Sequence, residues 1–583
     1  MTEKIVVYIS RTIVSNKDME QKTCQNCKEN FIIEPDDSTF YKKIGVPEPT
    51  LCPDCRLQRR LAWRNDLTFY NRTCDLCAKK IISLYHSAKK LTVYCNTCWW
   101  SDAWDPKSYG RDFDFSRPFF EQFRELQNIV PLPTLFNDDG VGSVNCEYTQ
   151  NTTFAKNCYM GAMTWYSEDM MYYYCIGGPD ARDLVDCMDI FTHAEKLYEC
   201  IFTERSYNCL YCYFSSGLSD SFFLYDCKGC SDCFMCVNLR QKKYCILNKQ
   251  YTKEDYQKIL QSYRLDTYAG RERAKKEFSD FLLEQPRRFA HIQNSVDCTG
   301  DNIVDSKNVK KSMMAFSSEN MRFQWRGMWL KDSYDLAPGG KSEECYEALT
   351  ADHDYRTFFA IYSLKSQEIE YTENCHSSKH LFGCSAIRHG EYVILNKQYD
   401  KKSFDELRTR IIAHMKKTGE YGEFFPASMS HFGYNETVAN DYFTLSEAEA
   451  KSKGFLWWDH IQKTTGQETL RPDEIPDAIA DVPDSILKDV LVCTLCHRNY
   501  KIVQNELNFY RKQNIPIPRK CFYCRHAERL ALENPMKLWH RQCDCTLTHP
   551  RHTYRCENEF ETPYSPDRSE IVYCEQCYNA EVV

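Results

Sequence analysis

Two CxxC pairs lie near each end of this 583-residue chain, and 24 residues separate the two pairs in both places. All four cysteines recur at an offset of 469 residues, and an aromatic pair, two prolines, Arg56 and Arg60 recur at the same offset. The N-terminal cysteines are Cys24, Cys27, Cys52 and Cys55, and the C-terminal ones are Cys493, Cys496, Cys521 and Cys524. The two ends of the chain therefore carry the same module.

The spacing of these cysteines predicts a metal site. Two cysteines separated by two residues form a tight knuckle whose thiolates converge, and two knuckles supply the tetrahedral sulfur set that zinc accepts. Four thiolates leave no open coordination position, so we expect a structural ion. Leu57 and Leu61 have helical spacing after the second pair. This predicts a knuckle, a hairpin and then a helix, as in treble-clef fingers.

A second set of cysteines follows each first set. In the N-terminal module it consists of Cys74, Cys77, Cys95 and Cys98. The C-terminal copy has Cys556, Cys574 and Cys577, but its opening knuckle is broken, and either Cys543 or Cys545 supplies the fourth ligand. We favour Cys543, which aligns with Cys74 through a shared Cys-Asp dipeptide, and Cys545 is then a spare thiol. The chain is thus expected to bind about four structural zinc ions.

Longer stretches of the sequence accompany this pattern. They include CILNKQYTKEDY, GEYGEFFPASMSHFGYNETVA and SPDRSEIVYCEQCYN. In these stretches and in its paired cysteines, the chain resembles an uncharacterised multi-zinc-ribbon, treble-clef-like family that is abundant in bacteria of the candidate phyla radiation. The resemblance covers most of the chain. It implies zinc binding and brings no established activity.

The middle of the chain is a repeat that is itself duplicated. From about residue 143 a loose unit of roughly 24 residues recurs, with endings such as YYYC, LYEC and LYDC. Short strands at regular spacing predict a β-solenoid-like domain, either a β-helix or a stack of short hairpins. The hexapeptide ILNKQY occurs at 246–251 and again 148 residues later at 394–399. Helices capped by Thr252 and Asp400 are expected to follow the two copies.

Sixteen cysteines lie in this middle region, and comparison of the two copies predicts their role. A metal ligand cannot be exchanged for a hydrocarbon, whereas a buried thiol can. Apolar residues replace three of them in the second copy: Val393 replaces Cys245, Leu381 replaces Cys233 and Val309 replaces Cys158. We therefore predict that most are core residues. Metal binding stays open for two groups, Cys227, Cys230, Cys233 and Cys236 in the first copy, and Cys375, His376, His380 and Cys384 in the second.

These observations predict a multidomain, mainly β protein. Terminal treble-clef or zinc-ribbon modules flank two related β-solenoid-like repeat domains, with connecting helices. The expected boundaries are 1–110 for the N-terminal double module, 111–285 and 286–417 for the two repeat domains, 418–490 for a linker region and 491–583 for the C-terminal double module. A capping box at Ser446 and Glu449 predicts a short helix in the linker.

Composition and motifs narrow the function. The formal net charge is −8, no apolar run is long enough to span a membrane, and no signal sequence is recognisable, which predicts a cytoplasmic protein. No catalytic motif is present, and we predict a non-enzymatic binding or scaffold protein. A carbohydrate-active β-solenoid enzyme is a less favoured alternative, and no small-molecule substrate is identified.

The partner is either nucleic acid or protein. Arg56, Arg59, Arg60 and Arg64 lie on one predicted helix and are the candidate contacts to nucleic-acid phosphates. In the C-terminal module only Arg56 and Arg60 have arginine counterparts, whereas Arg59 and Arg64 become Glu528 and Glu533. The recurring arginines are therefore expected to be structural, and the other two remain as phosphate contacts. A protein-binding scaffold without nucleic acid is the alternative.

Overall fold

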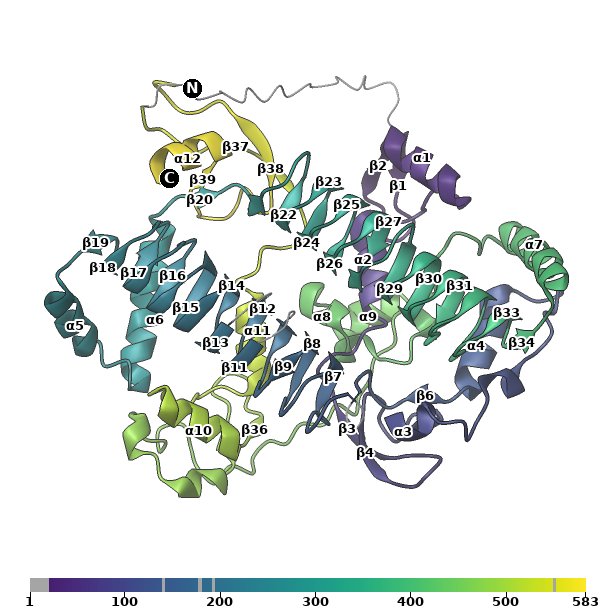
Figure 1. Ribbon diagram of the computed structural model, residues 1–583, viewed down its shortest axis with the longest axis horizontal. Helices are drawn as coiled ribbons and strands as arrows, with labels where there is room; N and C mark the ends of the chain where they lie inside the picture. The colour runs from purple at the N-terminus through teal and green to yellow at the C-terminus, as the bar shows by residue number, and fades with distance from the viewer. Residues whose placement is uncertain (1–19, 139–141, 177–180, 191–193, 549–551, 583) are drawn as a thin grey trace.

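The protein is mainly β and contains two large, mostly parallel sheets (Figure 1). The computed structural model describes residues 20–138, 142–176, 181–190, 194–548 and 552–582. Within these residues the first sheet has 13 strands and the second has 14. Small two-stranded hairpins belong to the modules at the two ends of the chain.

The strands of the first sheet pair in parallel with a short, regular step along the chain. From β13 to β18, paired residues on successive parallel strands are 12 positions apart, as in the pairs Tyr207 with Ser219 and Ser219 with Ser231. The strands are β7 Thr149–Thr153, β8 Gly161–Trp165, β9 Ser167–Glu168, β10 Tyr174–Ile176, β11 Ala181–Val185, β12 Met188–Ile190, β13 Ala194–Tyr198, β14 Ile201–Glu204, β15 Ser206–Ser216, β16 Ser219–Tyr225, β17 Ser231–Val237, β18 Lys243–Ile246 and the antiparallel β19 Lys249–Gln250.

The second sheet repeats this arrangement. Its strands are β21 Ile292–Gln293, β22 Gly300–Val304, β23 Lys307–Lys310, β24 Ser312–Phe316, β25 Glu319–Arg322, β26 Trp325–Met328, β27 Lys331–Leu336, β28 Gly339–Gly340, β29 Tyr346–Asp352, β30 Tyr355–Leu364, β31 Gln367–Glu373, β32 Lys379–Phe382, β33 Glu391–Ile394 and the antiparallel β34 Lys397–Gln398. Cys233 pairs with Cys245 in the first sheet, and their replacements Leu381 and Val393 pair in the second.

The expected repeat length of about 24 residues was wrong by a factor of two, and the hairpin alternative was wrong because the neighbouring strands are parallel. The reason lies in the backbone. A residue with positive φ recurs every third position over long stretches, as at Asp226, Gly229, Asp232 and Met235. Four such bends divide each 12-residue step. Asp and Asn tolerate this left-handed conformation, but Met and Tyr also adopt it here, so residue type does not reveal the short step.

At most positions of the two repeat regions the residue after a left-handed bend is buried, and these interior positions hold the central cysteines except Cys175, which has positive φ itself. In the first copy they form one buried cluster that includes Cys227, Cys230 and Cys233. The thiol of Cys227 lies 3.5 Å from the carbonyl oxygens of Tyr225 and Cys236 as a donor. Serine and threonine at other interior positions donate to carbonyls with the same sequence offsets. The interior thus selects small side chains that can donate to the backbone.

Asp354 is a carboxyl at an interior position of the second sheet, and it predicts a pH dependence. Its Oδ1 accepts the backbone N–H of Ser366 at 2.8 Å, and burial raises its pKa to about 7. An unfolded chain loses this proton near pH 4. Between about pH 4 and 7 the folded state therefore holds more protons than the unfolded state, and stability falls as the pH rises.

We expect Asp354→Asn, which removes the charge, to reduce the loss of stability between pH 5 and pH 8. Urea unfolding of the full chain at both pH values measures the difference. Asp280→Asn is the matched control, because the Asp280 side chain on α6 Tyr268–Leu283 is 65% exposed. Equal pH profiles for wild type and Asp354→Asn would contradict the assignment.

Helices follow both sheets as expected. Thr252 caps α5 Lys253–Ser262 and Asp400 caps α7 Lys401–Thr418, which confirms both predicted caps. Ser446 and Glu449 form the predicted capping box of α9 Glu447–Ser452. The remaining elements between the terminal modules are α4 Phe119–Ile129, α6 Tyr268–Leu283, α8 Val438–Tyr442, β20 Arg287–Arg288, η1 Pro106–Tyr109, η2 Ala427–Met429, η3 Tyr434–Glu436, η4 Ile479–Asp481 and η5 Asp484–Leu487.

The first unit of the N-terminal module packs on the second sheet, and the first unit of the C-terminal module packs on the first sheet. The first N-terminal unit has β1 Glu20–Thr23, β2 Asn30–Ile33, α1 Pro35–Ile44 and α2 Pro53–Leu61, and α2 contacts β27 and β29 of the second sheet (Figure 1). Its C-terminal counterpart has β35 Leu491–Val492, β36 Asn499–Tyr500, α10 Gln504–Lys512 and α11 Phe522–Leu530. Helix α11 lies against the first sheet, where Phe522 stacks on Tyr172. The zinc-site helix of the first unit in each module, α2 or α11, therefore packs on the repeat region that is more distant in sequence.

Candidate metal centres and the helices that carry them

The first N-terminal metal group joins a hairpin to a helix. Cys24 follows β1, Cys27 lies in the turn before β2, and Cys52 is the N-cap of α2. The sulfur atoms of Cys24, Cys27, Cys52 and Cys55 all lie within 4.8 Å of one another. A knuckle, a hairpin and a helix that begins at the second pair are the expected treble-clef elements.

Three further groups have the same four-sulfur arrangement. The second N-terminal group is carried by β3 Tyr70–Thr73, β4 Lys80–Ser83, β5 Val93–Tyr94 and α3 Asn96–Trp99, with β6 Leu132–Pro133 paired to β5. The last C-terminal group is carried by β37 Trp539–Gln542, β38 Glu559–Thr562, β39 Val572–Tyr573 and α12 Glu575–Val582. The groups are Cys74, Cys77, Cys95 and Cys98; Cys493, Cys496, Cys521 and Cys524; and Cys543, Cys556, Cys574 and Cys577.

The sulfur separations fit zinc. Two thiolates at tetrahedral positions, each about 2.3 Å from zinc, are about 3.8 Å apart. The separations are 3.7 Å for Cys27 and Cys52, 3.8 Å for Cys77 and Cys95, 3.6 Å for Cys496 and Cys521, and 4.0 Å for Cys556 and Cys574. The chain thus provides at least four structural zinc sites, with all four positions of each ion filled by sulfur.

Backbone N–H groups aimed at sulfur favour the thiolate form. The N–H of Cys95 lies 3.2 Å from the sulfur of Cys74, and the N–H of Cys52 lies 3.3 Å from that of Cys24. Burial raises the pKa of the Cys74 thiol, but the knuckle amides outweigh burial and lower it to about 7. The same balance lowers the pKa of Cys493 to about 7. Zinc binds the thiolate, so these amides prepare the sites for the ion.

The broken C-terminal knuckle uses Cys543 rather than Cys545 to complete its four-sulfur group. The N–H of Cys574 lies 3.2 Å from the sulfur of Cys543, which repeats the contact between Cys95 and Cys74. Cys545 joins a different group with His552 and Cys577. The sequence prediction treated Cys545 as spare and did not consider His552.

The central cysteines form no metal group within the described part of the chain. The thiols of the run from Cys227 to Cys236 donate to backbone carbonyls at their interior positions. In the second copy His376 is buried against Trp99 and Trp100, and burial lowers its pKa to about 3. His380 instead pairs with Glu368. Neither open alternative for metal binding therefore gains support.

The four candidate arginines pair with carboxylates of the protein itself, which agrees with the structural role expected for Arg56 and Arg60 and differs from the phosphate contacts expected for Arg59 and Arg64. Arg56 and Arg60 are fully buried and share Asp335 of β27, at 2.9 Å from each guanidinium. Arg59 bonds to Glu347 of β29 at 3.2 Å, and Arg64 bonds to Asp66 at 2.8 Å. The correction has a simple cause. Arg56, Arg59 and Arg60 of α2 face the second sheet and neutralise internal carboxylates. Helix α2 ends at Leu61, so Arg64 lies in the following loop, where it pairs with Asp66 and donates to Thr350 of β29 at 2.6 Å.

The C-terminal module repeats this buried clamp. Arg525 and Arg529 share Asp186, which lies between β11 and β12 of the first repeat region, at 2.8 and 2.9 Å. Arg525 also donates to the carbonyl of Lys520 at 2.8 Å, and Arg56 donates in the same way to the carbonyl of Leu51. Sequence reasoning missed both aspartates. Asp186 and Asp335 are 149 residues apart, which is close to the 148-residue offset between the two repeat copies. This recurrence is the sequence signal that could have linked the two aspartates to the recurring arginines.

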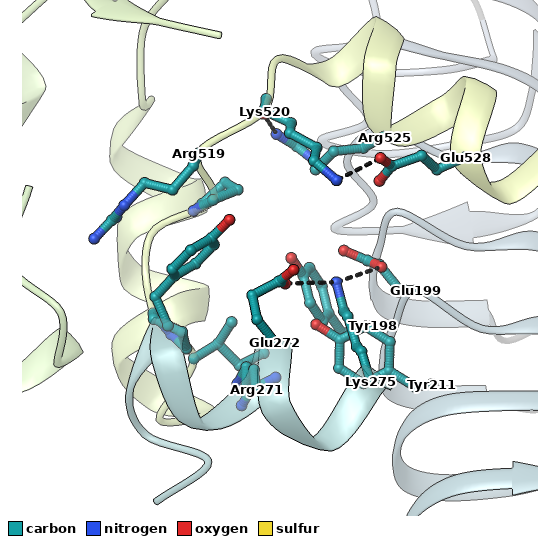
Figure 2. Close-up of a pocket in the computed structure, with 14 residues that line it drawn as sticks. Tyr198, Glu199, Tyr211, Arg271, Glu272, Lys275, Arg519, Lys520, Arg525 and Glu528 are labelled. Atoms are coloured by element: carbon teal, nitrogen blue, oxygen red, sulfur yellow. Dashed lines mark hydrogen bonds and ion pairs between the residues drawn. The ribbon is translucent and has the colours of Figure 1, made fainter. Parts of the chain in front are cut away.

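A pocket lies between the C-terminal module and the first sheet (Figure 2). Its charges are mostly compensated. Lys275 pairs with Glu199 and Glu272, each at 3.5 Å. Lys520 pairs with Glu528 on the opposite wall. The pocket therefore belongs to the docking interface, and its lysines and glutamates neutralise one another.

Comparison with known proteins agrees with the zinc chemistry. Residues 18–62 match a family model described as "Probable treble clef domain". A search of curated proteins gave no match. Within the described residues no helix is both long and apolar enough to cross a membrane. The chain thus carries an N-terminal treble-clef zinc-binding domain and is a zinc-binding protein with several four-cysteine sites.

Proposed function

We propose that the protein is a non-enzymatic scaffold in which zinc modules hold two narrow β-solenoids in a fixed relation. The 12-residue step and the buried interior positions support the solenoid interpretation. The whole chain is proposed to belong to the multi-zinc-ribbon family that its longer motifs resemble. Its zinc ions stabilise the fold, since four thiolates leave no position for a reacting ligand.

One observation carries this proposal: the recurring arginine helices face inward. Each zinc module directs two arginines at a single buried aspartate of a repeat region, Asp335 or Asp186. Arg326 of β26 also reaches Asp189 of the first sheet and Glu533 of the C-terminal module. Modules used as clamps fix the separation and angle of the two repeat regions, and that is the mechanical property of a scaffold.

A protein partner is the favoured ligand, because exposed aromatic rings lie on the first repeat region. Phe154 and Tyr166 are 56% and 55% exposed, and their rings stack with a centroid distance of 5.0 Å. They are 12 residues apart in sequence. Stacked, solvent-facing aromatic rings supply the rigid apolar contact area that protein interfaces favour.

We expect the double variant Phe154→Ser and Tyr166→Ser to lose partners that the wild-type chain retains in affinity capture from its native host. Trp329→Ser is the matched control, because Trp329 is 49% exposed on the second repeat region. Zinc content and urea unfolding should be unchanged in both variants. Capture that is equal for wild type and the double variant would count against this surface.

The nucleic-acid alternative has less support because its candidate arginines are buried. Its test is fluorescence anisotropy with single- and double-stranded DNA and RNA across a salt series. Binding that weakens steeply with salt and also weakens in Arg59→Ala would favour the alternative. Arg59 is the natural probe, since its side chain is 12% exposed whereas those of Arg56, Arg60 and Arg64 are exposed by 1% or less.

A further inference from the structure

A second group of metal-binding atoms adjoins the last zinc site. The sulfurs of Cys545 and Cys577 and a ring nitrogen of His552 lie within 4.8 Å of one another. Only Cys577 belongs both to this group and to the four-sulfur group. The ten residues between Cys545 and Cys556 have no counterpart in the N-terminal module, where CDLC stands in place of the broken knuckle. The ten inserted residues, 546–555, interrupt the CxxC pair and contain His552.

The hydrogen bond that His552 makes with the backbone fixes the ring tautomer that can bind a metal ion. Its Nδ1 lies 2.7 Å from the carbonyl oxygen of Tyr554, which can only accept, so Nδ1 carries a proton. In the neutral ring this leaves a lone pair on Nε2. A backbone carbonyl that holds the second ring nitrogen in this way is the usual support of a metal-ligating histidine.

The Nε2 lone pair faces the sulfur of Cys577 at 3.2 Å. When Cys577 is a thiolate ligand of the four-sulfur site, two electron-rich atoms face each other at this distance. A shared cation resolves the repulsion. Zinc bound to one nitrogen and one sulfur at tetrahedral positions holds them about 3.6 Å apart, which is close to the observed separation.

We infer that the C-terminal module binds a second thiophilic divalent ion through Cys545, His552 and Cys577, with Cys577 as a thiolate that bridges it to the four-sulfur site. Three protein ligands leave one position for water. This ion is therefore held by fewer protein groups than its neighbour, and it exchanges more readily. The chain then binds five zinc ions, and the scaffold proposal stands with either number.

Metal analysis of the full chain tests this inference. Protein is saturated with zinc, freed of excess by gel filtration, and measured by plasma mass spectrometry and native mass spectrometry. We expect about five zinc ions in the wild type and about four in His552→Ala and in Cys545→Ser. His540→Ala is the matched control and should retain about five, since His540 is an exposed residue of the same module that pairs with Glu559.

A chromogenic chelator supplies a second readout. About one zinc per wild-type chain should be released in a fast phase that is missing from His552→Ala. A wild-type count of four would overturn the inference, because His552 would then be an imidazolium that donates Nε2–H to the zinc-bound thiolate. A count of five that persists in His552→Ala would also overturn it, since the fifth ion would lie elsewhere.

Discussion

Asp335→Asn is expected to destabilise the protein by about 3–5 kcal/mol, although the substitution changes almost no volume. Asp335 is fully buried and neutralises Arg56 and Arg60, each at 2.9 Å. Without the Asp335 charge, Glu347 is the one carboxylate left to neutralise the buried guanidinium groups of Arg56 and Arg60. Glu347 lies 3.2 Å from Arg60 and 3.8 Å from Arg56. Urea unfolding of the full chain, followed by tryptophan fluorescence, measures the change.

The control for this prediction lies on the same repeat region. Glu343→Gln also removes one carboxylate charge, but Glu343 pairs with Lys331 at the surface, where both side chains are about half exposed. An exposed pair of this kind contributes about 0–1 kcal/mol. Asp186→Asn should reproduce the large effect in the first repeat region, because Asp186 neutralises Arg525 and Arg529. Similar small losses in all three variants would show that the clamps do not hold the modules.

Cys52→Ser is expected to remove about one zinc ion per chain and to unfold the first N-terminal unit, because structural zinc contributes on the order of 10 kcal/mol to such small domains. Cys52 is also the N-cap of α2, and serine is a favourable N-cap, so loss of helix capping cannot explain the effect. Limited proteolysis between residues 20 and 62 and plasma mass spectrometry give the two readouts.

Cys345→Ser is the matched substitution at an interior position. The thiol of Cys345 lies 3.4 Å from the carbonyl oxygen of Glu343 as a donor, and Ser333 and Thr357 occupy the interior positions one 12-residue step before and after it. A serine there can make the same hydrogen bond, so we expect unchanged zinc content and a stability change below about 1 kcal/mol. Loss of zinc in Cys345→Ser, or retention of zinc in Cys52→Ser, would refute the division of the cysteines into ligands and interior residues.

Local chemistry explains which features were predictable. Two CxxC pairs can bring four sulfurs together without help from distant parts of the chain. The cap residues Thr252, Asp400 and Ser446 likewise act within one helical turn. The 12-residue step was not predictable from periodicity. It depends on a left-handed residue at every third position, and residues as different as Asp226 and Met235 adopt this conformation.

The sequence by itself determined the zinc chemistry, the duplication of both the end modules and the middle, and the separation of ligand cysteines from interior ones. Only the tertiary structure decided the role of the arginine helix. Arg56 meets Asp335 across 279 residues of sequence, and Arg525 meets Asp186 across 339. No local pattern shows which surface a charged helix will cover. Whether an arginine stripe faces phosphate or a buried aspartate is decided by long-range packing, because desolvated charges require a partner at the point where the chain buries them.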